Sequence, residues 1–231
     1  MNGAALFVKL LEEQGTDIVF GYPGGTVLSI YDALYQERRR IRHIRTAHEQ
    51  GAAHAADGYA RVSGKTGVCI ATSGPGATNL VTGIANAYMD SVPIVFVTGN
   101  VPLPLIGTDS FQEVDITGIT LSVTKHNFMV KTPEELAPCL RAAFRIANTG
   151  RKGPVLVDIP RDILEMEMPD GSGLGYDWSV RLKQAPEIDP ARLEEAVSLI
   201  DASKRPLILA GGGIRSAGAA GILLELAKKI Q

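Results

Sequence analysis

The sequence has 231 residues, a formal net charge of -2, 45% hydrophobic and 21% charged residues, a balance that excludes a disordered chain or a coiled coil and fits one domain plus part of another. The near-neutral charge removes the electrostatic case for nucleic acid or an anionic membrane as main partner, and no apolar run approaches the roughly 20 residues of a membrane helix. Cys69 and Cys139 form no CxxC pattern and no basic-then-apolar leader precedes Met1, so we expect a cytoplasmic protein.

Apolar strand-like runs alternate with amphipathic segments along the first 165 residues. We predict helices over 2–14, 27–34, 48–62, 77–89 and 133–148. We predict strands over 17–20, 41–45, 68–72, 94–98, 126–131 and 155–159. Because continuously apolar strands that alternate with helices form sheets covered on both faces, the pattern indicates an α/β fold with a parallel, doubly wound sheet.

The composition changes after this first domain, which we expect to occupy residues 1–165. Residues 166–189 are rich in Gly, Pro, Asp and Ser and predict a linker. Residues 190–231 then predict the beginning of a second α/β domain, with a helix over 190–202, a strand over 206–210 and a helix after three glycines that runs to Gln231.

Two glycine-rich segments follow predicted strands. Residues 21–25 (GYPGG) follow the first strand and residues 72–79 (TSGPGATN) follow the third. Because open parallel sheets bind ligands beside the carboxyl ends of their strands, two such loops would line one crevice. Neither segment fits a P-loop or the G-x-G-x-x-G pattern, and a tight turn between strand and helix is the alternative for each.

Glu49 has two interpretations. The spacing of Thr46 and Glu49 is that of a capping box, in which both side chains satisfy free N–H groups at a helix start, and the spacing alone favours this role. Glu49 also follows the strand 41–45 and would point into the crevice. The four histidines show no metal-ligand spacing, so we expect no metal site. The polar segment 107–113 is a candidate substrate-side loop, or an ordinary connection.

Six segments, taken in order, carry a resemblance: GYPGG, HEQGAAHAADGYAR, TSGPGATN, GTDSFQE, TKHN and GPVLVDIPRD. Residues 1–162 closely resemble the N-terminal, pyrimidine-binding domain of thiamine-diphosphate enzymes, in particular the acetolactate synthase branch, and the resemblance continues more weakly into the start of a flavin-binding domain. It implies that pyruvate is decarboxylated on thiamine diphosphate and joined to a second 2-ketoacid, in branched-chain amino acid biosynthesis. It also implies a homodimer or larger assembly, with a small regulatory subunit as candidate partner.

Matching residue by residue carries the family's roles onto this sequence. Glu49 would hydrogen-bond N1′ of the aminopyrimidine, a role that suits a buried carboxyl with small apolar neighbours, and Gln112 would lie near the reacting carbons. Cofactor contacts are implied for Tyr22, Pro23, Gly24, Gly25, Thr72, Pro75 and Asn79, and a place on the substrate side for Gly25 and Thr26. Contacts with FAD are implied for Arg151, Gly211, Gly212 and Gly213.

One departure from the family is large. The family holds Mg²⁺ and the diphosphate with a Gly-Asp-Gly…Asn motif, which this sequence lacks. We therefore expect the chain to be an N-terminal part of a longer enzyme, with Mg²⁺ held elsewhere, and to be inactive alone. Two alternatives stay open: another thiamine-diphosphate 2-ketoacid decarboxylase or carboligase, and a non-catalytic binding module.

Overall fold

The computed structural model describes residues 1–169 and 187–230. These residues fall into two compact units, one on each side of residues 170–186. Most of the predicted linker, 166–189, lies outside the described residues. The division of the chain into a domain at 1–165 and the beginning of a second α/β domain therefore stays a prediction.

The first unit contains a six-stranded sheet in which every neighbouring pair is parallel. Its strands are β1 (Ile18–Gly21), β2 (Arg42–Arg45), β3 (Gly67–Ala71), β4 (Ile94–Asn100), β5 (His126–Met129) and β6 (Val155–Pro160). Their order across the sheet is β2-β1-β3-β4-β6-β5. The predicted α/β fold with a parallel sheet is confirmed.

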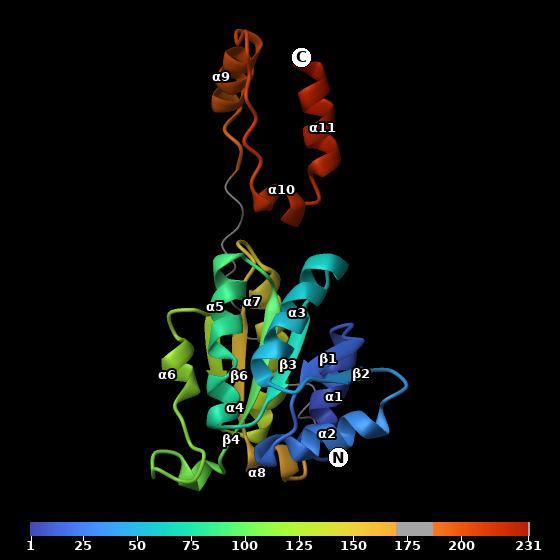
Figure 1. Ribbon diagram of the computed structural model, residues 1–231, viewed down its shortest axis with the longest axis vertical. Helices are drawn as coiled ribbons and strands as arrows, with labels where there is room; N and C mark the ends of the chain where they lie inside the picture. The colour runs from blue at the N-terminus through green and yellow to red at the C-terminus, as the bar shows by residue number, and fades with distance from the viewer. Residues whose placement is uncertain (170–186, 231) are drawn as a thin grey trace. The chain divides into compact units, whose positions relative to one another are not determined.

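Helices cover both faces of this sheet, and Figure 1 shows α3 and α5 in front of the strands. One face carries α1 (Gly3–Glu13), α2 (Leu28–Gln36), α7 (Leu136–Asn148) and α8 (Arg161–Glu165). The other carries α3 (Glu49–Ser63), α4 (Pro75–Thr78), α5 (Val81–Met89) and α6 (Ile116–Thr120). Short 3-10 helices occupy Gly25–Val27, Leu103–Leu105 and Pro133–Glu135. Within the two described ranges, no helix is both long and apolar enough to cross a bilayer.

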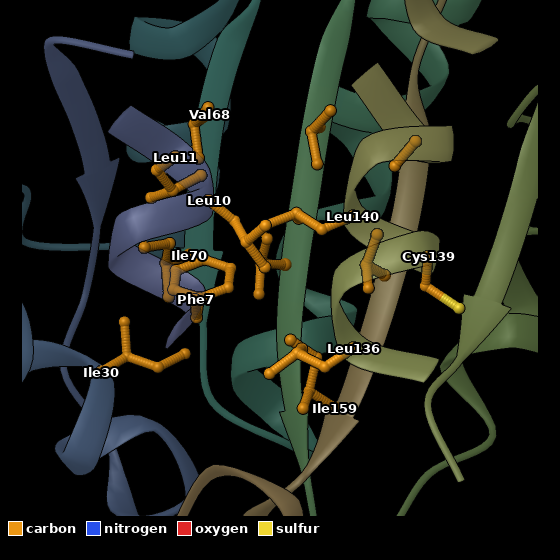
Figure 2. Close-up of a cluster of buried hydrophobic side chains, with 14 of the residues drawn as sticks. Phe7, Leu10, Leu11, Ile30, Val68, Ile70, Leu136, Cys139, Leu140 and Ile159 are labelled. Carbon is orange, nitrogen blue, oxygen red and sulfur yellow. The ribbon is translucent and has the colours of Figure 1, made fainter. Parts of the chain in front are cut away.

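Two hydrophobic clusters separate these layers, because successive side chains of a strand point to opposite faces. Along β3, Val68 and Ile70 belong to the cluster under α1 and α7, whereas Cys69 and Ala71 belong to the cluster under α3 and α5. Large side chains from α1 and α7 meet over the sheet in the first cluster, as Figure 2 shows for Phe7, Leu10, Leu11, Leu136 and Leu140. Each such side chain contributes about 1.5–3 kcal/mol by leaving water, which fixes both helices on the strands.

The connections reverse direction between β1 and β3. β1 continues into α2 on one face of the sheet, whereas its neighbour β3 continues into α4 and α5 on the opposite face. Such a topological switch point opens a crevice at the carboxyl ends of the two strands. Both glycine-rich segments lie there, since one directly follows β1 and the other directly follows β3.

Three local predictions were wrong. The helix predicted over 77–89 is divided into α4 and α5, because the amide of Leu80 bonds the carbonyl of Ala77 in a tighter turn. The strand predicted over 206–210 has no partner strand among the described residues, and Leu207 is 93% exposed, so nothing there stabilises an extended ladder. The last predicted helix is divided into α10 (Gly212–Ser216) and α11 (Ala220–Lys229), between which Gly218 has φ +65°. The helix predicted over 190–202 forms as α9 (Pro190–Asp201).

The contact between α3 and α5 depends on Gly83. A Cβ at Gly83 would overlap the Cβ of Ala53, so we expect Gly83→Ala to lower the free energy of unfolding by about 1–3 kcal/mol, as overpacking does. Gly58 in α3 is the control, because a Cβ there meets nothing within 4 Å, and Gly58→Ala should raise stability by about 0.4–1 kcal/mol. Urea unfolding of both variants measures the difference. Equal stabilities would show that α3 and α5 are not in close contact at Gly83.

Candidate active site

The loops that follow β1, β3 and β4 gather at one edge of the sheet. In a parallel sheet all carboxyl ends lie at the same edge, and α4 and α8, which follow β3 and β6, lie at the lower edge of the sheet in Figure 1. Glu49, the first residue of α3, follows β2 and belongs to the same edge. The edge therefore brings together Glu49 and the two glycine-rich segments.

Two threonines join the glycine-rich segments. The hydroxyls of Thr26 and Thr72 lie 3.0 Å apart, and the amide of Ser73 donates to Thr26 Oγ1 at 3.1 Å. Thr72 is buried, and a Cβ at Gly24 would overlap its side chain. The backbone of residue 24 thus lies directly against Thr72, and the two segments are in contact at the carboxyl ends of β1 and β3.

Glu49 is held by Asn79 and not by the start of its own helix. Its side chain is 8% exposed, and Asn79 Nδ2 donates to Glu49 Oε2 at 2.9 Å. His48 caps α3 by accepting from the amide of Gln50, while the Thr46 hydroxyl donates to the carbonyl of His48. The capping-box interpretation of Thr46 and Glu49 is therefore wrong, because Thr46 points away from the free N–H groups and the carboxyl of Glu49 turns toward the segment after β3.

The second oxygen of Glu49 lies beside Gly76. A Cβ at Gly76 would stand 3.3 Å from Glu49 Oε1 and 2.6 Å from Thr72 Cγ2, so the glycine leaves room for this oxygen. Two further polar groups are near. Burial raises the pKa of the Cys69 thiol and of the Tyr31 hydroxyl, and the nearby Glu49 carboxylate adds to both increases. Both groups stay neutral at physiological pH.

The segment after β4 brings Gln112 to the same edge. Gln112 is exposed and has φ +60°. Its backbone lies against Gly74, where a Cβ would be 2.7 Å from Gln112 O. Gly74 itself has φ +57°, a conformation that favours glycine. The structure thus places Gln112 against the segment whose Asn79 holds Glu49.

Four further residues that were predicted to contact the cofactor lie at the same edge of the sheet. Tyr22 is 36% exposed, and its amide donates to the carbonyl of Ile70 at 3.3 Å, which anchors the first segment on β3. Pro23 is half-buried, whereas Gly25 and Pro75 are exposed. All four lie on the two glycine-rich segments.

Comparison with known protein families identifies this arrangement. Residues 1–119 match the family described as "Thiamine pyrophosphate enzyme, N-terminal TPP binding domain", which is more than half of the chain. The chain belongs to the thiamine pyrophosphate enzymes. The buried carboxyl, the glycine-rich segments and the Gln112 loop therefore lie within, or directly against, a domain of the type that binds thiamine pyrophosphate.

Individual relatives are similar over almost the whole chain. The probable acetolactate synthase large subunit of Methanocaldococcus jannaschii is 51% identical over 234 aligned residues, which cover 100% of this chain and 39% of the relative. The acetolactate synthase large subunit of Corynebacterium glutamicum is 52% identical, and the alignment covers 95% of this chain and 35% of the relative. The acetolactate synthase isozyme 2 large subunit of Escherichia coli is 49% identical, and the alignment covers 97% of this chain and 40% of the relative. The chain thus spans less than half the length of these relatives.

Arg151 lies at the other edge of this thiamine pyrophosphate enzyme domain. It precedes β6, and its guanidinium donates to Ser91 Oγ at 2.8 Å and to the carbonyls of Tyr88 and Met89 at 3.1 Å. Arg151 and Tyr88 line a pocket of about 280 Å³, together with Thr124, Lys125 and Lys152. This positively charged pocket is separated from Glu49 by the length of the sheet.

The three predicted FAD glycines lie in the second unit. Gly211 precedes α10, whose first two residues are Gly212 and Gly213. All three are exposed, and a Cβ at any of them would meet nothing within 4 Å. Across residues 1–169 and 187–230, no group of three or more His, Cys, Asp or Glu side chains is arranged to hold a metal ion.

Asp158 is a buried polar residue that the sequence analysis missed. Its side chain, in the middle of β6, is 0% exposed and accepts hydrogen bonds of 2.6 Å from Thr98 Oγ1 and from Asn100 Nδ2. An aspartate inside the otherwise apolar run Val155–Ile159 could have indicated this buried carboxyl from the sequence. Burial raises the pKa of Asp158 to about 6, with Asp115 adding to the increase, although the hydrogen bonds from Thr98 and Asn100 oppose it.

This buried carboxyl predicts a pH-dependent stability. Because the folded pKa of Asp158, about 6, exceeds the ordinary value of 3.8, the folded state binds the proton more tightly than the unfolded chain. The protonated Asp158 therefore adds to the free energy of unfolding. This contribution is fully present below the ordinary pKa of 3.8 and is lost as the pH rises through the folded pKa of about 6, by about 3 kcal/mol in total. Urea unfolding between about pH 3.5 and 7.5, a range that includes both pKa values, should show this loss of stability in the wild type relative to Asp158→Asn. A constant difference between the two proteins would contradict the assignment.

Proposed function

We propose that this chain is the N-terminal part of an acetolactate synthase catalytic subunit, which decarboxylates pyruvate and joins the product to a second 2-ketoacid in branched-chain amino acid biosynthesis. The observation that carries the proposal is the buried Glu49 carboxyl, which is held by Asn79 and lies beside Gly76 of the second glycine-rich segment. The names of the relatives, which are similar to this chain over 95% or more of its length, support the specific activity.

The residues present fit the pyrimidine half of thiamine diphosphate. This cofactor, when bound, supplies a thiazolium carbon that attacks the 2-keto group. Glu49 would share a proton with the ring nitrogen N1′ of the cofactor, and the bond from Asn79 to Oε2 fixes the orientation of its carboxyl. The carboxyl is buried, and Ala52 and Ala53, one turn further along the same helix, are fully buried small apolar residues. Gln112 lies on the substrate side, together with Gly25 and Thr26.

We assign the FAD contacts to Arg151 and to Gly211, Gly212 and Gly213. The positive charges of Arg151 and Lys152 beside one pocket suit an anionic group such as a diphosphate, and the open glycine backbone suits a close approach of a ligand. Mg²⁺ is held, in this proposal, by residues outside the 231 that bind the cofactor diphosphate.

The proposed assembly is a homodimer or larger, with a small regulatory subunit as candidate partner, in the cytoplasm. The chain spans 35–40% of the length of its relatives. In this proposal it holds the pyrimidine half of the cofactor site, and the diphosphate half comes from a second copy of the enzyme. Both cysteines are free and buried, in keeping with a reducing compartment.

The product of pyruvate turnover tests the proposed reaction. The full-length enzyme that carries this chain should convert pyruvate with thiamine diphosphate, Mg²⁺ and FAD to acetolactate. Acetaldehyde as the main product would identify a decarboxylase instead. Absence of turnover, with the cofactor bound, would identify a non-catalytic module.

The isolated 231-residue chain should neither bind thiamine diphosphate tightly nor consume pyruvate. The diphosphate carries most of the charge by which the cofactor is held, and each neutral hydrogen bond to the pyrimidine contributes only about 0.5–1.5 kcal/mol. Calorimetric titration with thiamine diphosphate and Mg²⁺, alongside a pyruvate-consumption assay, measures both properties. Micromolar or tighter binding with turnover would mean that the diphosphate site lies within this chain.

A further inference from the structure

The segment that carries Gln112 is held in place by three carboxyl groups. It comprises residues 101–115, between the end of β4 and the start of α6. Two of the carboxyl groups, Asp158 and Asp162, lie outside the segment, on β6 and α8. The third, Glu113, belongs to the segment itself. None of these residues was assigned a role from the sequence.

Asp162 and Asp158 hold the first turn of the segment. The amide of Leu103 donates to the two carboxylate oxygens of Asp162 at 3.1 and 3.3 Å. Asp158 acts one step away: Asn100 Nδ2 donates to it at 2.6 Å, and Asn100 Oδ1 accepts from the amide of Val101 at 2.7 Å. Asn100 is 3% and Asp158 0% exposed. Burying these polar groups is costly unless each is bonded, so the arrangement fixes the direction in which the chain leaves β4.

Glu113 holds the tip of the segment. Its carboxylate accepts from the amide of Gly107 and, at 3.1 Å, from the amide of Ser110. Asp109 and Gln112, on either side of Ser110, have φ +55° and +60°, conformations that residues other than glycine adopt only when their surroundings impose them. The exposed tip therefore has a defined shape, and its position relative to Gly74 follows from where residues 101–103 direct it.

We propose that Asp158 and Asp162 are positioning residues that place Gln112 against Gly74 and so over the crevice that contains Glu49. This inference rests on the proposed function, because it gives the Gln112 side chain its place beside the reacting carbons. Asp162 acts directly on the backbone of the segment, and Asp158 acts through Asn100. A displacement of about 1 Å at a reacting group lowers the rate about 100-fold, so two hydrogen-bonded contacts at the base of the segment control turnover without touching substrate.

Amide hydrogen exchange of the 231-residue chain tests the contact independently of any reaction. In Asp162→Ala the amide of Leu103, which loses its acceptor, should exchange about tenfold faster, as expected for the loss of one hydrogen bond to a charged group. Asp162→Asn keeps an acceptor for Leu103 and should restore most of the protection. The matched control is Glu165→Gln on the same helix, because Glu165 pairs only with the exposed Arg161 in the described structure. Unchanged exchange in Asp162→Ala would overturn the proposal.

A double-mutant cycle in the full-length enzyme tests whether the contact acts through Gln112. Asp162→Ala should lower kcat about 10- to 100-fold, with Asp162→Asn close to wild type. In a Gln112→Ala background the same substitution should lower kcat less than about threefold, because residues that act as one unit are not additive. Asp158→Ala removes the acceptor of Asn100 and should speed exchange of the Val101 amide and lower kcat, whereas Asp158→Asn, whose amide oxygen still accepts from Asn100, should restore both. Unchanged exchange and kcat in Asp158→Ala would remove Asp158 from the positioning role.

The outcomes separate the two proposals. Full additivity of Asp162→Ala and Gln112→Ala would leave Asp162 a purely structural residue and overturn the positioning role. Wild-type enzyme that forms no acetolactate would instead overturn the proposed function. In that case faster exchange of the Leu103 amide in Asp162→Ala would still support the contact that holds the segment.

Discussion

Glu49→Gln is expected to lower acetolactate formation by the full-length enzyme by about 10²- to 10⁴-fold, the range typical of a lost acid–base group. The amide has the shape of the carboxyl and still offers an oxygen to Asn79, whose bond to Glu49 is 2.9 Å long. It has no carboxyl proton to share with N1′ of the pyrimidine. Steady-state assays of acetolactate at saturating pyruvate and cofactor measure the loss.

The control for this substitution is His54→Gln, which replaces an exposed residue of the same helix. It should leave turnover and the melting temperature unchanged. Glu49→Gln should also melt like the wild type, since the buried hydrogen bond is retained. Wild-type turnover in Glu49→Gln would remove Glu49 from the reaction, and a large decrease in melting temperature would assign it a structural role.

Gly74→Ala is expected to have the second large effect, on both stability and turnover. Gly74 has φ +57°, where an alanine is strained by about 1–3 kcal/mol. Its Cβ would also lie 2.7 Å from Gln112 O and 3.0 Å from Gln112 Cα, so the backbone of the Gln112 segment must move. We expect about 100-fold lower turnover from this displacement, measured in the full-length enzyme together with its urea-unfolding free energy.

Gly107→Ala separates strain from displacement. Gly107 has φ +81° in the same segment, but a Cβ there meets nothing within 4 Å. It should therefore show a similar loss of stability and a turnover within about threefold of the wild type, because positive-φ strain alone moves no neighbour. Equal losses of turnover in the two variants would mean that the close approach of Gln112 to Gly74 does not matter for the reaction.

The sheet was predictable because its signal is local. Strands such as Val68–Ala71 are buried on both faces, so they are continuously apolar in sequence, and the helices between them carry one apolar face. The strand expected at residues 206–210 has the same apolar character but no neighbour among the described residues. A strand is stabilised by its partners, which a local pattern does not contain.

The site was less predictable because its contacts join distant residues. The spacing of Thr46 and Glu49 fits a capping box, and only the position of Asn79, brought near by the switch between β1 and β3, shows that the carboxyl turns the other way. The roles of Asp158 and Asp162 depend likewise on β6 lying next to β4. Residues of these types are also common at a helix start or inside a strand for purely structural reasons. Sequence spacing alone therefore does not distinguish a structural role from a role in the site.

The most direct test of the role of Glu49 is the exchange of the C2 proton of bound thiamine diphosphate with deuterium, measured by proton NMR after rapid quenching. Wild-type full-length enzyme and Glu49→Gln are compared at cofactor saturation, with binding checked by calorimetry. If Glu49 shares its proton with the pyrimidine and thereby activates C2, the substitution should slow the exchange by at least about 100-fold, with thiamine diphosphate affinity changed less than about tenfold. Equal exchange rates in two fully loaded proteins would contradict the assignment of Glu49 to this reaction.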